Sequence, residues 1–241
     1  MKDYEKIVQD MVSWLRDKRD KTGLKGAVFG LSGGVDSAVV AGLAKLAFGD
    51  DHLAIVMPIH SLEEDEVDAK LVADKLGIKT ARVDLTSTYD DFVKSAKADD
   101  FSKMSLSNIK PRLRMSNLYL YGQNLSYMVV GSSNKSEYLV GYFTKWADSA
   151  CDIYLLRDFY KREVYEIAKV LGVPDEVINK KPSAGLWKGQ SDEDELGVSY
   201  DDIEKYFEGE AIAKEKEERI KKLYNSTEHK RSDIDYFKNI Y

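Results

Sequence analysis

The sequence predicts an α/β fold in which a Rossmann-like parallel sheet carries helices on both faces, and three observations support this prediction. Short apolar segments alternate along the chain with segments of helical periodicity, which is the pattern of consecutive β-α-β units. A glycine-rich loop, residues 30–37, overlaps the end of the first apolar segment. No internal repeat or low-complexity linker divides the chain. Because ligands of such sheets bind at the carboxyl ends of the strands, this loop also marks the expected site.

The first predicted elements alternate clearly. Apolar residues at i, i+3 and i+4 spacing predict an amphipathic helix over residues 3–20. The apolar run 26–31 predicts a strand. Residues 35–48 are apolar on almost every side and predict a helix buried against the sheet. A second apolar run, 52–59, predicts a strand that Pro58 interrupts.

The next segments continue the pattern. Residues 63–77 predict a helix with Gly77 as its C-terminal cap. Residues 78–85 alternate between apolar and polar side chains, as a strand does. A further helix is expected at 86–97. The segment 97–107 is expected to form a loop.

The second half of the chain is predicted to be mainly helical. Residues 108–126 predict a helix, and residues 127–143 predict a strand, a turn and a short helix. Residues 158–172 carry apolar side chains on one face and predict an amphipathic helix. The segment 173–198 is expected to be rich in loops. The last helices are expected at 199–208 and 210–225.

The composition indicates a globular protein with a sizeable core. Of the 241 residues, 43% are hydrophobic and 32% are charged, as in ordinary globular domains. The formal net charge of −6 argues against nonspecific binding to nucleic acid or to anionic membranes. The sequence has neither an apolar run long enough for a transmembrane helix nor the apolar core of a signal peptide. We therefore expect one domain over residues 1–241 and a cytoplasmic location.

The glycine-rich loop differs from two common phosphate-binding motifs. It lacks the lysine of a Walker loop and the spacing of a Rossmann fingerprint. Gly33 and Gly34 allow backbone amides to turn towards an anion, while Ser32 and Ser37 add hydroxyl donors. Asp36 would repel a phosphate, and a divalent cation between the two removes this repulsion. The loop therefore predicts a site for phosphate and metal together.

The string S-G-G-V-D-S resembles the PP-loop of ATP pyrophosphatases, which cleave ATP between the α and β phosphates and hold the departing pyrophosphate. The single cysteine, Cys151, argues against the members of this group that transfer sulfur. Glutamine-dependent members need a cysteine nucleophile, but residue 2 is Lys2. We therefore expect a nitrogen-transferring enzyme to use free ammonia and to have no glutaminase domain.

Five strings along the chain resemble ammonia-dependent NAD synthetases: SGGVDS, GSSNKSEYLVGYFTKWAD, KPSAGLW, SDEDELGVSYDDIEKYFEG and HKR. The resemblance covers almost the whole chain. It implies that deamido-NAD, ATP and ammonia are converted into NAD, AMP and pyrophosphate through an adenylylated intermediate. It also implies Mg²⁺ as cofactor, ATP as co-substrate, and a homodimer whose interface helps to bind deamido-NAD.

The resemblance implies a role for residues that match the family motifs. The implied ATP-binding residues are Gly30, Leu31, Ser32, Gly33, Gly34, Val35, Asp36, Ser37, Ser132, Lys161 and Ser183. The implied deamido-NAD-binding residues are Arg112, Lys145, Asp152, His229 and Lys230. Asp36 and Glu137 are the implied magnesium ligands. Asp36, Lys161 and Asp148 are the catalytic candidates. Either Asp148 or Asp152 could position ammonium or accept its proton.

The sequence departs from the family pattern at ADSACD, residues 147–152. Ala147, Ser149 and Ala150 stand where the family often has glycine, and a positive φ at these positions would strain the backbone. The segment PSAGLW also differs from the more acidic family version. These departures put the shape of two loops in question but leave the implied chemistry unchanged.

Two alternative functions remain open from the sequence. One is another PP-loop ligase, such as the synthetase half of a GMP synthetase. The other is a non-catalytic module that binds a nucleotide, although paired carboxylates at Asp36 and Glu137 are more than such a module needs. The first helix and the helix at 108–126 look more apolar than surface helices, so we expect them at the dimer interface.

Overall fold

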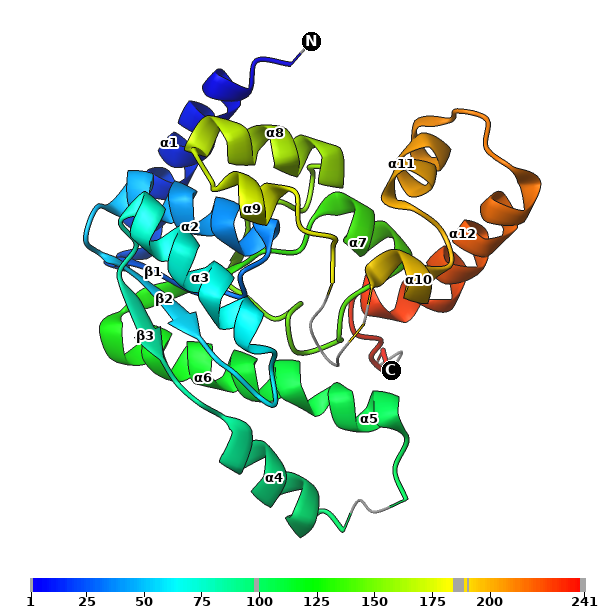
Figure 1. The fold of residues 1–241 in the computed structure, drawn as a ribbon, viewed down its shortest axis with the longest axis horizontal. Helices are drawn as coiled ribbons and strands as arrows, with labels where there is room; N and C mark the ends of the chain where they lie inside the picture. The colour runs from blue at the N-terminus through cyan, green and yellow to red at the C-terminus, as the bar shows by residue number, and fades with distance from the viewer. Residues whose placement is uncertain (1, 98–99, 184–188, 190, 239–241) are drawn as a thin grey trace.

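The centre of the computed structural model is a five-stranded parallel sheet with the strand order β3-β2-β1-β4-β5 (Figure 1). The structure describes residues 2–97, 100–183, 189 and 191–238. The strands are β1 (Gly26–Gly30), β2 (His52–Val56), β3 (Thr80–Arg82), β4 (Tyr127–Gly131) and β5 (Ile153–Tyr154). Along the chain, β2 and β3 are added on one side of β1, and β4 and β5 are then added on its other side. The carboxyl ends of β1 and β4 therefore form the switch point where ligands of such sheets bind.

Helices cover both faces of the sheet, as the sequence predicts (Figure 1). On one face lie three helices that pack against one another, α1 (Tyr4–Thr22), α2 (Val35–Phe48) and α8 (Lys161–Leu171). With the sheet they enclose the largest apolar cluster, which includes the fully buried Leu15 and Phe29. The opposite face is covered by α6 (Ile109–Leu125), which contacts β1 and β4 over a second apolar cluster. The predicted α/β fold is confirmed.

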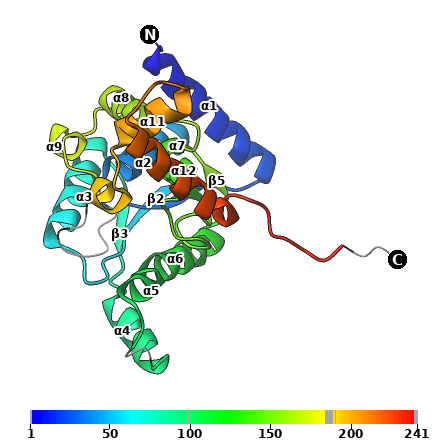
Figure 2. The same cartoon turned by 90° about the vertical axis from the view of Figure 1, so that its right-hand side faces the viewer.

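Further helices of the sheet region pack against these four. They are α3 (Glu63–Leu76), α4 (Thr86–Ser95), α5 (Lys103–Ser107) and α9 (Asp175–Ile178). α3 packs against α2 and ends at Gly77, whose left-handed conformation matches the predicted cap. Figure 2 shows α4 projecting away from the body below α5.

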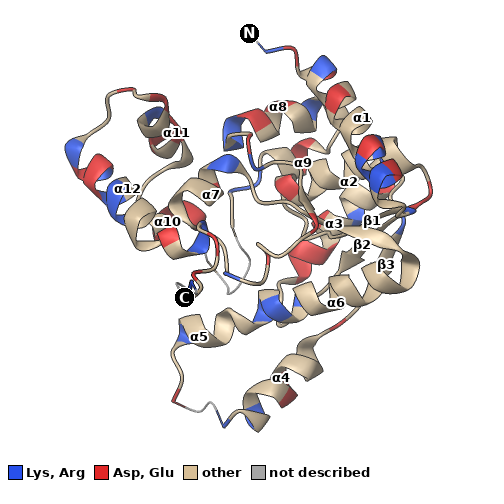
Figure 3. Ribbon diagram, turned by 180° about the vertical axis from the view of Figure 1, so that it is seen from behind, with Lys and Arg blue, Asp and Glu red and all other residues tan. Residues whose placement is uncertain are grey.

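A separate group of helices follows along the chain and packs around α7 (Lys135–Val140). Its members are α10 (Asp192–Leu196), α11 (Tyr200–Glu208) and α12 (Lys214–Ser226), followed by the 3-10 turn η1 (Glu228–Lys230). They share a third apolar cluster that includes Val140, Ile203 and Ile220. Acidic and basic residues are interspersed along α12 (Figure 3). After η1 and a turn at residues 231–232, residues 233–238 leave the body as an extended segment (Figure 2).

The predicted element boundaries are wrong in the short segments. The strand expected over 78–85 is reduced to three residues, and the two-residue strand β5 was not predicted. The expected loop 97–107 contains α5, and the loop-rich segment 173–198 contains α9 and α10. Elements of two to five residues are too short to show a hydrophobic period. Tertiary contacts and local caps define them instead, such as the Ser102 side chain that caps α5.

Within the described ranges, no helix is long and apolar enough to cross a membrane. This finding agrees with the absence of a long apolar run in the sequence.

Candidate active site

The glycine loop connects β1 to α2 and is braced by its own serines. Ser37 Oγ donates to the carbonyl oxygen of Gly34 at 2.9 Å, and it accepts a hydrogen bond from the Ser32 amide at 3.2 Å. Gly33 has a φ of +83°, and a Cβ atom there would lie 2.5 Å from the carbonyl oxygen of Asp65. Glycine is therefore required at this position both by the backbone conformation and by the close approach of α3.

A cavity of about 790 Å³ opens beside this loop, at the carboxyl ends of β1 and β4. It brings together residues that lie far apart in the sequence. From the predicted ATP site it is lined by Gly30, Leu31, Ser32, Gly34, Val35, Asp36, Ser37, Ser132, Lys161 and Ser183. From the predicted substrate, metal and catalytic residues it is lined by Arg112, Glu137, Lys145, Asp148, His229 and Lys230. Residues 184–187 of the KPSAGLW motif lie outside the described residues.

A cluster of charged side chains lies in the wall of the cavity next to the glycine loop. Lys161, whose side chain is only 5% exposed, forms an ion pair with Asp36, and its Nζ lies 3.9 Å from Glu137 Oε1. Burial lowers the pKa of Lys161, but the two carboxylates more than offset this effect and raise it. Burial and the Asp36 carboxylate raise the pKa of Glu137. Lys161 therefore stays protonated beside Asp36 and Glu137.

The two carboxylates fit a magnesium ion that also binds phosphate. In nucleotide sites Mg²⁺ is typically held by one or two carboxylates together with substrate phosphates, and it retains several waters. Asp36 and Glu137 supply two such carboxylates beside the loop. Among the residues described, no group of three or more His, Cys, Asp or Glu side chains converges to hold a metal without a substrate. The donor set therefore fits an ion that arrives with ATP.

Asn134 is a further site residue that was not predicted from the sequence. It is fully buried at the N-terminus of α7, and its Nδ2 donates to Asp36 Oδ1 at 2.9 Å. Asn134 and Glu137 also form a capping box, in which each side chain bonds the backbone amide of the other residue. The pattern Asn-x-x-Glu before an apolar segment is the signal that could have identified it.

The predicted substrate residues other than Asp152 line the cavity and are joined to its neighbouring segments by hydrogen bonds. Arg112 Nη2 donates to the carbonyl oxygen of Lys145 at 3.2 Å, and Lys145 Nζ donates to the carbonyl oxygen of His229. Lys230 Nζ bonds two carbonyl oxygens in residues 141–143 at 2.7 and 2.6 Å. These bonds attach η1 to the loop after α7 and gather three cations on one side of the cavity. Such a group suits an anionic substrate.

Asp148 lies on the same wall, where its Oδ1 accepts a hydrogen bond from the Thr144 amide at 2.9 Å. Desolvation raises the pKa of Asp148 to about 6. The neighbouring residues Ala147, Ser149 and Ala150 avoid the left-handed region that their glycine counterparts would favour, whereas Trp146 has a φ of +59°. The loop 147–152 thus accommodates side chains in place of glycine without strain at the substituted positions.

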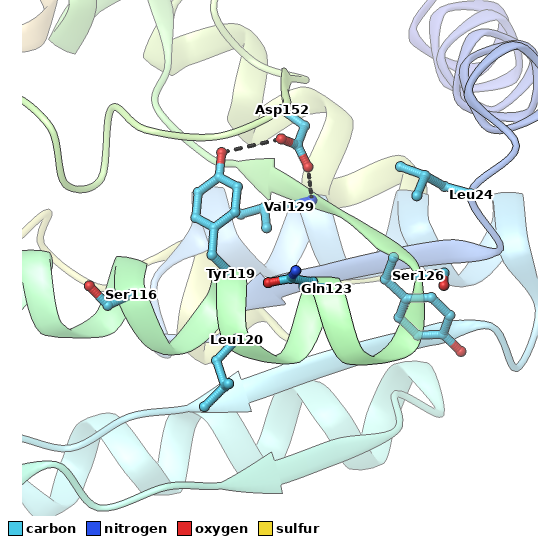
Figure 4. Close-up of a pocket in the computed structure, with 10 residues that line it drawn as sticks. Leu24, Ser116, Tyr119, Leu120, Gln123, Ser126, Val129 and Asp152 are labelled. Atoms are coloured by element: carbon cyan, nitrogen blue, oxygen red, sulfur yellow. Dashed lines mark hydrogen bonds between the residues drawn. The ribbon is translucent and has the colours of Figure 1, made fainter.

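Asp152 is placed apart from the other predicted substrate residues. It lines a second hollow of about 650 Å³, beside α6 and bordered by Leu24 and Leu120 (Figure 4). Its Oδ1 accepts a hydrogen bond from Tyr119 Oη at 3.2 Å, and its Oδ2 accepts one from the Val129 amide at 2.7 Å. The structure therefore gathers four of the five predicted substrate residues around one cavity and leaves Asp152 at another.

Two other residues reach the site without having been predicted. Arg114 lines the cavity from α6, and its Nε donates to the carbonyl oxygen of Met57 at 3.0 Å. Tyr200, at the start of α11, donates from Oη to Asp192 at 2.9 Å and lies 3.5 Å from Glu137 Oε1. Arg114 is the second arginine of the run that contains the predicted Arg112, which is a signal that could have identified it. Tyr200 is an ordinary member of a helical pattern, so nothing in the sequence distinguishes it.

The glycine loop at the switch point and the charged cluster beside it are the features expected of an α/β enzyme of the PP-loop class. A family model described as NAD synthase matches residues 7–233. An NH(3)-dependent NAD(+) synthetase from Finegoldia magna is 49% identical over 95% of this chain and 94% of its own length. The chain belongs to the NAD synthase family and is an enzyme of its ammonia-dependent group. The GMP-synthetase-like ligase and the non-catalytic module are thereby set aside.

Solved structures share the fold of this chain. NMN synthetase from Francisella tularensis superimposes with a TM-score of 0.94 at 36% identity, and both chains are covered completely. The NH3-dependent NAD synthetase from Campylobacter jejuni has a TM-score of 0.82 at 29% identity, with 99% of this chain and 100% of the other covered.

Proposed function

We propose that this enzyme uses ATP and Mg²⁺ to join ammonia to the nicotinate carboxylate of deamido-NAD, giving NAD, AMP and pyrophosphate. The observation that carries this proposal is the single cavity that connects the glycine loop to the basic group formed by Arg112, Lys145 and Lys230. The glycine loop would bind the triphosphate of ATP, and the basic group would bind an anionic substrate. The family of the chain supports the same reaction.

The first chemical step would activate the carboxylate. A carboxylate oxygen attacks the α phosphorus of ATP, the bond between that phosphorus and the bridging oxygen breaks, and pyrophosphate leaves with the bonding electrons. The loop amides and the Lys161 ammonium would hold the negative charge that develops on pyrophosphate. Asp36 and Glu137 would hold Mg²⁺, which neutralises phosphate charge when it is bound. Arg112 and Lys145 would orient the nicotinate substrate for attack.

The second step would form the amide. Ammonia attacks the carbonyl carbon of the acyl adenylate, the C–N bond forms, and AMP leaves with the electrons of the C–O bond. One proton must leave the nitrogen. Asp148 lies on the cavity wall with a pKa of about 6, so at neutral pH it is a carboxylate that can position ammonium and accept a proton. Asp152 lies at the other hollow, which favours Asp148 for this role.

We also propose that the enzyme acts in the cytoplasm as a homodimer of one-domain subunits that use free ammonia. Two helices support the predicted dimer face, because Trp14 on α1 is 40% exposed and Leu120 on α6 is 66% exposed. Leu120 borders the hollow that contains Asp152 (Figure 4). A dimer through α6 would enclose this hollow and bring Asp152 into a shared substrate site.

A second candidate function is amidation of a mononucleotide, nicotinic acid mononucleotide, to NMN. It is favoured by the TM-score of 0.94 to the Francisella tularensis NMN synthetase, against 0.82 for the Campylobacter jejuni NAD synthetase. A mononucleotide lacks the adenylate half of the dinucleotide. It would therefore fit within the main cavity and would not need the hollow at Asp152.

A substrate comparison tests both candidates. The purified enzyme is incubated with ATP, Mg²⁺, ammonium and either deamido-NAD or nicotinic acid mononucleotide, and the products are measured by mass spectrometry. We expect NAD and AMP in equal amounts, with a higher kcat/KM for deamido-NAD than for the mononucleotide. A higher kcat/KM for the mononucleotide would establish the second candidate. If neither substrate gave AMP, both candidate functions would be overturned.

A further inference from the structure

The helix that carries Lys161 is capped by residues from other elements. The residue before α8 is Tyr160, whose side chain makes no capping hydrogen bond. The amide of Lys161 instead donates to Ser136 Oγ at 3.1 Å, and the amide of Arg162 donates to Glu204 Oε1 at 3.3 Å. The first amides of a helix have no partner within the helix. The position of the first turn of α8 therefore depends on α7 and on α11.

Glu204 is the centre of this arrangement. Its side chain is 2% exposed, and its Oε1 also accepts a hydrogen bond from Ser136 Oγ at 2.9 Å. Its Oε2 accepts one from Arg162 Nη1 at 3.0 Å. A buried carboxylate with these partners at the N-terminus of α8 is favourably placed with respect to the helix dipole. Glu204 is thus held rigidly between α7 and α8.

The contacts of Glu204 lead directly to the proposed catalytic groups. Ser136 precedes the proposed magnesium ligand Glu137 on α7, and Arg162 follows Lys161 on α8. We propose that Glu204 is a positioning residue: it locks the first turn of α8 against α7 and so holds the Lys161 ammonium between Asp36 and Glu137. This inference rests on the proposed role of Lys161 in ATP cleavage.

Glu208 provides a matched control on the same helix. It lies one turn after Glu204 on α11 and pairs with Nη2 of the same Arg162 guanidinium. Its side chain is 33% exposed, and its ion pair is with the outer end of Arg162. If the pairing of Arg162 were the important feature, substitution of either glutamate would have the same effect. If the cap on α8 is important, only Glu204 should affect ATP chemistry.

The test measures kcat, the KM for ATP, the KM for the nicotinate substrate and the melting temperature of E204Q, E204D and E208Q. We expect E204Q to lower kcat/KM for ATP on the order of 10- to 100-fold, as a misplaced catalytic group does. Its KM for the nicotinate substrate should stay within about twofold, because Arg112 and Lys145 are untouched. E204D, which keeps the charge, should recover part of the loss. E208Q should resemble the wild type.

A double-mutant cycle with Lys161→Ala shows whether Glu204 acts through Lys161. If it does, E204Q should have little further effect on kcat once Lys161 is absent. An equal loss from E204Q with and without Lys161 would overturn the inference, as would identical kinetics of E204Q and E208Q. Should E204Q fail to fold, E204D and Ser136→Ala carry the same comparison. An inactive wild type would refute the proposed function, whereas an active wild type with an unaffected E204Q refutes this inference alone.

Discussion

Asn134 Nδ2 donates a hydrogen bond to Asp36 Oδ1 at 2.9 Å, joining two residues 98 positions apart. The contact connects the turn after β4 to the glycine loop after β1. Because Lys161 pairs with the other carboxylate oxygen of Asp36, this side chain is fixed from two sides. The geometry of the proposed metal site is therefore built from three segments of the chain itself.

Removal of Asn134 should weaken magnesium binding. Asn134→Ala deletes both the hydrogen bond to Asp36 and the cap on α7, and loss of such a cap costs about 1 kcal/mol of stability. We expect a lower free energy of unfolding in urea and a several-fold higher Mg²⁺ concentration for half-maximal activity. Asp3→Ala is the control, because Asp3 caps α1 and its loss should lower stability without changing the magnesium requirement. An unchanged magnesium requirement in Asn134→Ala would show that Asp36 needs no orientation by this residue.

Replacement of Asp36 should abolish pyrophosphate release while the protein remains folded. Asp36→Ala removes a proposed metal ligand, and we expect a loss of rate on the order of 100-fold or more. Lys161 Nζ still has Glu137 Oε1 at 3.9 Å as a counter-charge in this variant. The buried ammonium is therefore not left without a partner, and we expect the variant to unfold cooperatively. A pyrophosphate assay and a thermal melt measure the two effects. Asp50→Asn, which removes the carboxylate of an exposed ion pair, is the control. Wild-type turnover by Asp36→Ala would refute the metal role.

The dependence of the rate on pH should reflect Asp148. Desolvation raises its pKa to about 6, so the carboxylate form needed to position ammonium predominates above this pH. We expect kcat at saturating ammonium to fall as the pH drops through about 6. Asp148→Asn cannot titrate at this position, so it should have a lower kcat that no longer falls as the pH drops through about 6. If kcat of the variant still falls in this pH range as in the wild type, another group accepts the proton.

Asp152 should discriminate between the two nicotinate substrates. Its hollow lies beside α6 and is not lined by Arg112, so we expect Asp152 to contact only the adenylate half of a dinucleotide. We expect Asp152→Asn to raise the KM for deamido-NAD several-fold and to leave the KM for the mononucleotide unchanged. Arg112→Ala should raise both KM values on the order of tenfold or more, because it removes charge-assisted hydrogen bonds. Equal effects of Asp152→Asn on both substrates would place Asp152 outside the adenylate subsite.

The sequence predicts those features that a local pattern determines. The period of apolar residues predicts α1, α2 and α8, and the residue types of the string 32–37 predict the glycine loop between β1 and α2. The resemblance to a family selects Lys161 and Glu137, which the fold brings to that loop. The helices and the glycine loop need only spacing and residue type, whereas Lys161 and Glu137 need the family motifs as well.

The residues that the sequence did not predict owe their position to tertiary contacts. Glu204 reads as one acidic residue among several on a polar helix, and only the packing of α11 against α7 buries it. Asp152 appears beside Asp148 in the sequence, but the chain turns into β5 after this point and separates the two side chains. Which side chains the fold brings together or separates depends on long-range packing, and local propensity and residue spacing do not predict this packing.

Attack of the nicotinate carboxylate on the α phosphorus of ATP is the central step of the proposed reaction, and oxygen transfer tests it most directly. Deamido-NAD labelled with ¹⁸O in its carboxylate is converted with ATP, Mg²⁺ and ammonium, and the mass of the AMP is measured. Because one carboxylate oxygen bridges carbon and phosphorus in the acyl adenylate, the AMP should carry one ¹⁸O atom, and the NAD amide should retain the other. Formation of NAD together with unlabelled AMP, or with ADP and phosphate, would contradict this mechanism.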